Sequence, residues 1–269
     1  MPDQTLCHGG DHSPQLPPPP GLRVIPVESW DQLVTYFRQM AVKNRGFIFR
    51  GQADAAWDPV PSLYRKLIGP HSQWSERGAL PTLLGSFRRN IVGLRGANPP
   101  ALSDDQLWAL ARHHGMYTPL LDFTSSPYVA AYFAFSDRSV KDESQRAIWA
   151  LNLSYLPDKE ANPSVIVDEL DPILVSGSSD GNMRLKAQAG LLLKLHPERP
   201  LREWADQQGA RYPNQNIMLK FELNNYDRCA VLSELRAMNI TALTLFPDFD
   251  GAARQCNEAM DEFLIRKSE

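Results

Sequence analysis

Apolar residues recur at three- and four-residue intervals in several parts of the chain. The first such group follows Ser29 and comprises Trp30, Leu33, Val34, Phe37 and Met40. This spacing is typical of an amphipathic helix. Similar spacing and capping signals predict further helices at residues 80–91, 103–115, 127–134, 226–238 and 251–266.

Two of these helices have clear start signals. Ser103 and Gln106 have the spacing of a capping box, and Gly115 is placed to end that helix. Ser126 followed by Pro127 favours a helix start, because proline at the first helical position lacks only an N–H that would have no partner inside the helix.

Shorter stretches show the two-residue alternation of strands. In residues 46–51, Phe47 and Phe49 lie on one face and Ile48 and Arg50 on the other. Further strands are predicted at residues 120–123, 146–153, 183–195, 216–223 and 241–246. This mixture of helices and strands predicts an α+β fold.

The chain divides into a short leader and one domain. Residues 1–22 are polar and contain the run Pro17–Pro20, so we expect a disordered Pro-rich leader in solvent. Docking of that run in an aromatic groove is the alternative. Residues 23–269 have no internal repeat and no linker, which predicts a single domain. The chain has 22 prolines, and most of them lie in this domain, so we expect many turns.

Charge narrows the function classes. The 269 residues carry a formal net charge of −3, which argues against a general nucleic-acid binder because such domains are usually basic. Residues 41–95 nevertheless hold nine basic and three acidic residues. They form either a local positive surface for an anionic ligand or ordinary solvated charge.

Cysteine content and hydropathy indicate the compartment. The three cysteines, Cys7, Cys229 and Cys256, form no CxxC pair, so neither a disulfide framework nor a thiolate metal site is expected. We expect Cys229 and Cys256 to be buried. No run approaches the roughly 18 apolar residues of a membrane span, and no signal peptide begins the chain. These features predict a cytoplasmic protein.

Arg50 is the first candidate for chemistry, because it ends an apolar strand. A guanidinium there needs a partner, since unpaired charge is costly to bury. The partner is either an internal carboxylate such as Asp122 or a carboxylate or phosphate of a ligand, which the planar fork of arginine fits. Gly51 has no side chain and would permit close approach of a ligand or a second backbone.

A second cluster lies between residues 111 and 126. His114 shares the predicted apolar helix face, so we expect it to point inward and His113 to point elsewhere. Adjacent histidines do not converge on one metal, and no metal site is predicted. His114 is then either a buried, hydrogen-bonded residue or a group that orients a ribose hydroxyl or transfers a proton. The segment Thr124–Ser126 precedes a helix start, which is either a simple cap or an anion site.

A third cluster covers residues 183–190. Alternation places Arg184, Lys186 and Gln188 on one face of the predicted strand. That face is either a solvent face or, at Gln188 next to Gly190, the point where the chain enters the core.

These motifs, in this order, resemble the FRG domain family over about residues 27–265. The matching segments are Phe49–Gln52, Pro61–Arg65, His113–Thr124 and Ala131–Ala134, followed by Arg184, Gln188, Gly190 and Phe246–Asp248. Two departures stand out. Arg112 occupies a position where the family more often has glutamine, and Pro119 one where it more often has arginine. The absent arginine weakens the expectation of a second cation in the site.

The chain is more distantly similar to ADP-ribosyltransferases. That similarity implies a curved or split mixed sheet flanked by helices, which grips NAD across its cleft. It implies that Arg50 holds the NAD phosphates or ribose and that Thr124 supports the nicotinamide ribose. Gln188 or Glu222 would stabilise the oxocarbenium ion as nicotinamide leaves.

The resemblance also extends the list of candidate site residues. Gly51, Gln52, Asp122 and Tyr132 are expected around the NAD cofactor, and His114 among the catalytic residues. It implies a nucleotide or dinucleotide ligand and an unknown macromolecular acceptor, in a bacterial toxin or phage-defence role.

Two alternatives remain. One is a non-catalytic module that senses a nucleotide or phosphate. The other is a hydrolase or nuclease that uses the His113–His114 pair and Asp122.

Overall fold

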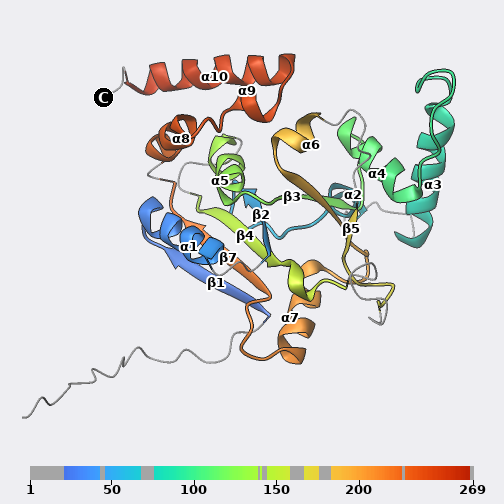
Figure 1. Cartoon of the computed structure of the whole chain (residues 1–269), viewed down its shortest axis with the longest axis horizontal. Helices are drawn as coiled ribbons and strands as arrows, with labels where there is room; N and C mark the ends of the chain where they lie inside the picture. Colours follow the sequence, from blue (N-terminus) through green and yellow to red (C-terminus); the bar gives the residue numbers. More distant parts are fainter. Residues whose placement is uncertain are drawn as a thin grey trace, which may run out of the picture.

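A seven-stranded mixed sheet forms the centre of the molecule (Figure 1). The computed structural model describes residues 21–42, 46–67, 76–138, 140, 144–157, 167–175, 183–225 and 228–266. The strands are β1 (Leu22–Val27), β2 (Phe47–Gln52), β3 (Leu120–Thr124), β4 (Arg146–Asn152), β5 (Ile173–Val175), β6 (Gly190–Lys194) and β7 (Met218–Leu223). Their order is β1-β7-β4-β2-β3-β6-β5, with β1 parallel to β7 and the other neighbours antiparallel.

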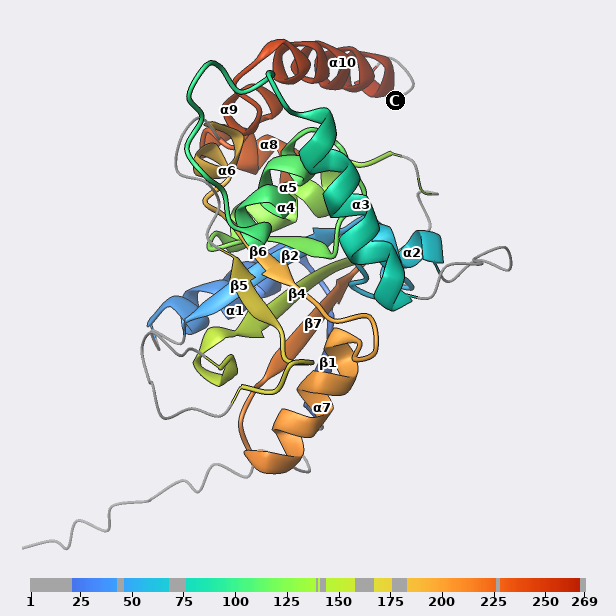
Figure 2. The same cartoon turned by 90° about the vertical axis from the view of Figure 1, so that its right-hand side faces the viewer.

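Helices flank this sheet, so the fold is α+β as predicted. The helices are α1 (Trp30–Val42), α2 (Ser62–Leu67), α3 (Glu76–Asn90), α4 (Asp104–His113), α5 (Pro127–Ser136), α6 (Met183–Ala187), α7 (Leu201–Arg211), α8 (Arg228–Ala237), α9 (Ala242–Leu245) and α10 (Phe249–Arg266). Side chains of α1, α5 and α8 build one apolar core with the sheet, and those of α2 and α7 build another. Figure 2 shows α7 at the opposite end of the molecule from α10.

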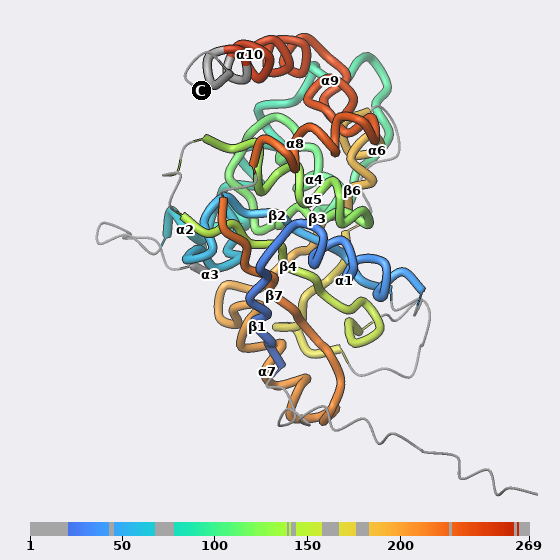
Figure 3. Tube along the Cα trace, turned by 90° about the vertical axis from the view of Figure 1, so that its left-hand side faces the viewer, coloured from blue at the N-terminus to red at the C-terminus, as the bar shows by residue number. Residues whose placement is uncertain are grey.

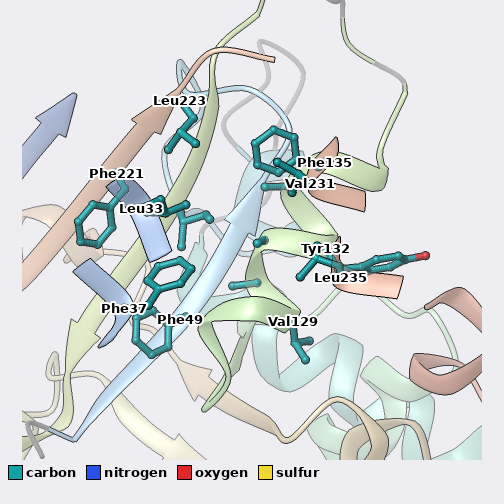
Figure 4. Packing of buried hydrophobic residues seen from close by; sticks show 14 of the residues in the cluster. Leu33, Phe37, Phe49, Val129, Tyr132, Phe135, Phe221, Leu223, Val231 and Leu235 are labelled. Carbon is teal, nitrogen blue, oxygen red and sulfur yellow. The ribbon is translucent and has the colours of Figure 1, made fainter. Parts of the chain in front are cut away.

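The first core is centred on Phe37 of α1. Its ring centroid lies 5.5 Å from that of Tyr128, 6.0 Å from that of Phe49 and 6.3 Å from that of Phe221, all in edge-on contacts. Figure 4 shows Phe37 with Phe49 and Phe221. Aromatic pairs favour this geometry, and each contributes stability beyond its buried area. Strand β2 is therefore held firmly on the face that carries Phe49.

Strand pairing within the sheet is shortest between β2 and β3. These two strands share the single registered pair Phe49–Thr124, whereas β2 pairs with β4 over six residues and β3 with β6 over five. Beyond Phe49 the two strands separate, and Arg50 lies at the start of the gap. The predicted mixed sheet flanked by helices is present, and all seven strands belong to one sheet.

Most of the predicted elements are confirmed. The helices predicted at 103–115 and 127–134 correspond to α4 and α5. Ser103 forms the expected capping box with Gln106, and the Ser126 hydroxyl accepts from the Val129 N–H at 3.3 Å. Ile48 faces one core and Phe49 the other, as the alternation in β2 predicts.

Two strand predictions are wrong. Residues 183–187 form helix α6 rather than the first half of a strand, and the chain then reverses into β6. Ala189 has a positive φ of 47°, and Gly190 lets Leu185 lie where a side chain would stand. Residues 242–245 form helix α9 because Thr241 and Thr244 cap each other's backbone N–H groups.

Other elements are absent from the sequence prediction. Strand β1 begins at Leu22, the last residue assigned to the leader, and Figure 3 shows it at the sheet edge beside β7. Residues 1–20 of the predicted leader lie outside the described residues.

Cys229 and Cys256 are exposed, which corrects the expectation that they are buried. No helix in the described part of the chain is both long and apolar enough to span a membrane.

Candidate functional site

A pocket of about 600 Å³ opens where β2 and β3 separate. Strands β2 and β3 form its floor, and α4, α6 and the chain after α9 contribute its walls. Four arginines line it against two acidic residues. These charged residues are Arg50, Arg65, Arg112, Arg184, Asp122 and Asp137. The lining also includes the aromatic residues Phe49, Trp57, Phe123, Phe133 and Phe246.

Arg50 is the innermost cation of this pocket. Its Nη1 donates a 2.9 Å hydrogen bond to the main-chain carbonyl of Asp122, so the guanidinium bridges the gap between β2 and β3. Its Nε is buried, and no acceptor within the described residues bonds to it. Burial lowers the pKa of Arg50 to about 10; Asp122 opposes this shift and the nearby Arg112 and Arg65 add to it. Arg50 remains charged at neutral pH, with a donor to spare.

The Asp122 carboxylate pairs with Arg112 rather than with Arg50. Arg112 donates from Nε to Oδ1 at 3.3 Å and from Nη2 to Oδ2, a bidentate pair. Burial would raise the pKa of Asp122, but Arg112, with help from Arg50, holds it below its usual value. The predicted Arg50–Asp122 partnership therefore uses the carbonyl oxygen rather than the carboxylate. Arg112 also supplies the second cation that the missing arginine at Pro119 made doubtful.

Thr124 holds the end of β3 in place. Its hydroxyl donates to the carbonyl of Gln188 at 2.7 Å and accepts from the Ser126 N–H at 3.0 Å. The Ser125 N–H bonds to the carbonyl of Ala189. Because these N–H groups already have protein partners, the segment serves as a cap and a tie rather than an open anion site.

Gln188 reaches the pocket from a turn rather than from a strand. It lies between α6 and β6, and its Nε2 donates to the carbonyl of Leu245 at 3.1 Å. Gln188 therefore lines the same pocket as Arg50 and Thr124, but from a turn and not from the predicted strand. This hydrogen bond fixes the amide and directs its nitrogen toward the protein.

Gly51 and Gln52 line the pocket but serve the fold. A Cβ at Gly51 would lie 1.8 Å from the carbonyl oxygen of Ala130, so β2 can contact α5 only with glycine there. The Gln52 amide accepts from the Trp149 indole and donates to the carbonyl of Asp58 at 3.4 Å. The second backbone anticipated at Gly51 is thus that of helix α5.

Arg184 closes one side of the pocket. It donates to Asp248 at 2.5 Å and to Asp250 at 2.7 Å, and its guanidinium carbon lies 5.7 Å from the centre of the Phe246 ring. These hydrogen bonds raise the pKa of Arg184 above its usual value. The residue joins α6 to the start of α10.

Three predicted site residues lie outside the pocket. Glu222 is on β7, two strands away from β2, and pairs with Lys220 at 2.5 Å. Tyr132 is buried in the core, and its hydroxyl donates to Glu258 at 2.5 Å. His114 is exposed after the end of α4, which corrects the expectation that it points inward.

Sequence reasoning passed over several residues that do line the pocket. His113 takes the place expected of His114; burial lowers its pKa, and His114 and Arg184 lower it further. Trp57 and Arg65 also line the pocket but were not assigned to the site. Their signal in the sequence was a tryptophan and a cation close to Arg50. Within the described residues, no group of three or more His, Cys, Asp or Glu side chains is placed to hold a metal ion.

Comparison with known proteins gives one match. Residues 45–143 match the FRG domain family. No curated protein and no solved structure matches the chain. The matched segment includes β2, α4 and β3, and therefore Arg50, Arg112 and Asp122. Gln188 and the segment around Phe246 lie beyond it, so the match is narrower than the predicted resemblance over residues 27–265.

Proposed function

We propose that this chain, whose residues 45–143 match the FRG domain family, binds NAD in its pocket and acts as an ADP-ribosyltransferase-like enzyme on an unknown macromolecular acceptor. The observation that supports this proposal is the meeting of Arg50, Thr124 and Gln188 at one pocket. The similarity to ADP-ribosyltransferases implies these three positions in this order along the chain. They come from β2, from its neighbour β3, and from the turn that leads into β6, the next strand across the sheet.

The contacts suggest what each residue does. The charged Arg50 side chain lines the pocket and could donate to a phosphate oxygen, and charge-assisted hydrogen bonds of this kind are among the strongest in proteins. The Nε2 of Gln188 is engaged by Leu245, which leaves the amide oxygen to accept from a ribose hydroxyl. Thr124 acts through Gln188, since its hydroxyl bonds to that residue's carbonyl and to Ser126.

The reaction proposed is cleavage of the bond between nicotinamide and ribose. That bond breaks with both electrons leaving on nicotinamide, positive charge develops on the ribose, and an acceptor nucleophile or water then attacks the same carbon. The Gln188 amide oxygen would stabilise the developing cation through its dipole. A neutral amide does this less well than a carboxylate, so we expect slow turnover. A toxin or phage-defence role in bacteria belongs to the same proposal.

A non-catalytic nucleotide sensor is the second candidate. It is favoured by the absence of a carboxylate at Gln188 and by the pairing of Asp122 with Arg112. The hydrolase alternative has no such support, because His114 does not line the pocket alongside His113 and Asp122.

Substitution of Gln188 by glutamate distinguishes the two candidates. We expect wild-type protein to release nicotinamide from NAD slowly, and Gln188→Glu to release it at least about tenfold faster, since a carboxylate stabilises a cation more strongly. Nicotinamide is measured by chromatography, and transfer is followed with labelled NAD. Gln207→Glu, at an exposed position of α7, makes the same change from amide to carboxylate outside the pocket and should have no effect. NAD that binds saturably but stays intact with both proteins would support the sensor.

A further inference from the structure

Trp57 is an exposed aromatic residue in the lining of the pocket between β2 and β3. It is 44 % exposed, whereas the other four tryptophans in the described part of the chain are at most 4 % exposed. A single exposed apolar side chain is common on protein surfaces and needs no explanation by itself. What distinguishes Trp57 is the support beneath the backbone that carries it.

Residues 53–58 lie between β2 and α2, and we call them the Trp57 loop. Two buried cations of the sheet bond to its main chain. Arg146 of β4 donates from Nη1 to the Ala53 carbonyl at 2.6 Å, and Lys220 of β7 donates from Nζ to the Ala55 carbonyl at 2.5 Å. Burying a charge is costly unless it is hydrogen-bonded, so movement of the loop would deprive both cations of an acceptor. The loop is therefore fixed to the sheet before any ligand binds.

The Trp57 loop also holds its own backbone. The N–H groups of Ala56 and Trp57 donate to the carboxylate and the carbonyl of Asp54, at 2.8 Å and 3.2 Å. The Ala55 N–H donates to the carbonyl of Gln145 at 2.7 Å. A tryptophan side chain has only two rotatable bonds, so on a fixed backbone it offers a large flat ring at a low entropy cost of binding. Trp57 is thus preorganised to stack on a planar group of a ligand.

Trp57 and Gln188 lie at different positions along β2. Gln188 bonds through its carbonyl to Thr124, and Thr124 pairs with Phe49. The residue that follows Trp57 accepts a hydrogen bond through its carbonyl from Gln52, three residues further along the strand. Three strand residues span about 10 Å, so Trp57 and Gln188 serve separate parts of the pocket.

Arg50 follows Phe49 in β2 and so lies between these two positions. In the proposed function, Arg50 binds the NAD phosphates and Gln188 faces the ribose that carries nicotinamide. The two phosphates of a dinucleotide separate its two nucleosides. Phosphates on Arg50 and the reactive ribose at Gln188 therefore direct the other nucleoside, adenosine, toward Trp57.

We propose that Trp57 stacks on the adenine base of the bound dinucleotide and determines the preference of the pocket for a diphosphate that carries this base. The inference rests on the proposed NAD site and adds the position of adenine within it. Bases stack favourably on aromatic side chains because every base has a flat π face. Trp57 contributes affinity and selectivity and takes no part in bond cleavage.

Titration calorimetry with two probes tests this assignment. ADP-ribose carries adenine without nicotinamide, and inorganic pyrophosphate carries no base. We expect Trp57→Ala to weaken binding of ADP-ribose at least about tenfold, because stacking on an aromatic ring contributes roughly this much affinity per base. Binding of pyrophosphate should change less than about twofold, because it makes no stacking contact.

Two further variants control for the ring and for its place. Trp57→Phe keeps an aromatic ring and should bind ADP-ribose within about threefold of wild type. Tyr212→Ala removes an aromatic residue that is 38 % exposed outside the pocket, and should change neither affinity. Unchanged ADP-ribose affinity in Trp57→Ala, equal losses for both probes, or no binding of ADP-ribose to wild type would overturn the proposal.

Tryptophan fluorescence and turnover separate this inference from the proposed reaction. Stacking on adenine should quench the Trp57 emission of wild type, whereas Trp57→Phe should bind ADP-ribose with much less quenching. NAD that binds through Trp57 but stays intact would overturn the catalytic proposal alone. Cleavage of NAD by Trp57→Ala with an unchanged KM would overturn the stacking alone.

Discussion

Two arginines line the same pocket in opposite circumstances. Arg50 is buried and bonds to a main-chain carbonyl, its Nε has no partner within the described residues, and burial lowers its pKa to about 10. Arg184 is more open, its guanidinium is shared by two carboxylates, and these hydrogen bonds raise its pKa. The difference separates a cation with capacity for a ligand from one already used to hold two segments together.

Ligand affinity should show the largest contrast between them. We expect Arg50→Ala to weaken binding of ADP-ribose at least about 100-fold, because it removes one or two charge-assisted hydrogen bonds worth roughly 1.5–3 kcal/mol each. Arg184→Ala should weaken it less than about fivefold. Isothermal titration calorimetry measures both, and Arg50→Lys tests whether charge without the planar fork suffices. Equal losses of ADP-ribose affinity in the two alanine variants would contradict the proposed difference between Arg50 and Arg184.

The support beneath Arg50 should be sensitive to added volume. Gly51→Ala places a methyl group 1.8 Å from the Ala130 carbonyl oxygen, so β2 and α5 must move apart. We expect a loss of about 1–3 kcal/mol in the free energy of unfolding, measured with urea. Gly85→Ala is the matched control: its Cβ would meet nothing closer than 3.5 Å, inside helix α3. That change should leave stability equal or higher by about 0.5–1 kcal/mol.

The smallest effect concerns pH. Because Arg112 and Arg50 lower the pKa of Asp122 in the folded protein, this carboxylate contributes stability above its unfolded pKa and loses that contribution as pH falls through the folded value. Wild type should therefore exceed Asp122→Asn in stability at pH 6 by about 1 kcal/mol or less, since the side chain is 45 % exposed.

That advantage of the wild type should shrink toward pH 3. Thermal unfolding across this range provides the measurement. Asp104→Asn, which removes an exposed pair with Arg88, controls for loss of any surface carboxylate. A difference that grows as pH falls would contradict the assigned direction of the Asp122 pKa shift.

Local signals in the sequence predicted much of this fold. Capping residues and helical spacing located α4 and α5, and alternation placed Phe49 and Ile48 on the correct faces of β2. Residues 183–187 were wrongly predicted as a strand. Five alternating residues fit a strand as well as they fit one and a half turns of helix. The reversal at Ala189 depends on contact between Leu185 and Gly190, which no local pattern contains.

The site was predictable where it lies on paired strands and unpredictable elsewhere. Arg50, Asp122 and Thr124 were found because apolar strands frame them. Arg112 was noted only as a departure from the family pattern, yet it holds Asp122 from a neighbouring helix. Glu222 was misplaced because strand order, not sequence distance, puts β7 two strands away from β2. Such through-space relations depend on topology, which single-sequence patterns do not specify.

The incomplete pairing between β2 and β3 has a consequence for ligand binding. Past the Phe49–Thr124 pair, the floor of the pocket consists of two strands that are each paired on their other side, β2 with β4 and β3 with β6. Little chain entropy is then lost on association, since the receiving groups are already in place. A ligand that contacts both β2 and β3 would link the two strands where they are not paired with each other. Because these strands lie in the middle of the sheet, ligand binding should stiffen the whole sheet rather than one edge of it.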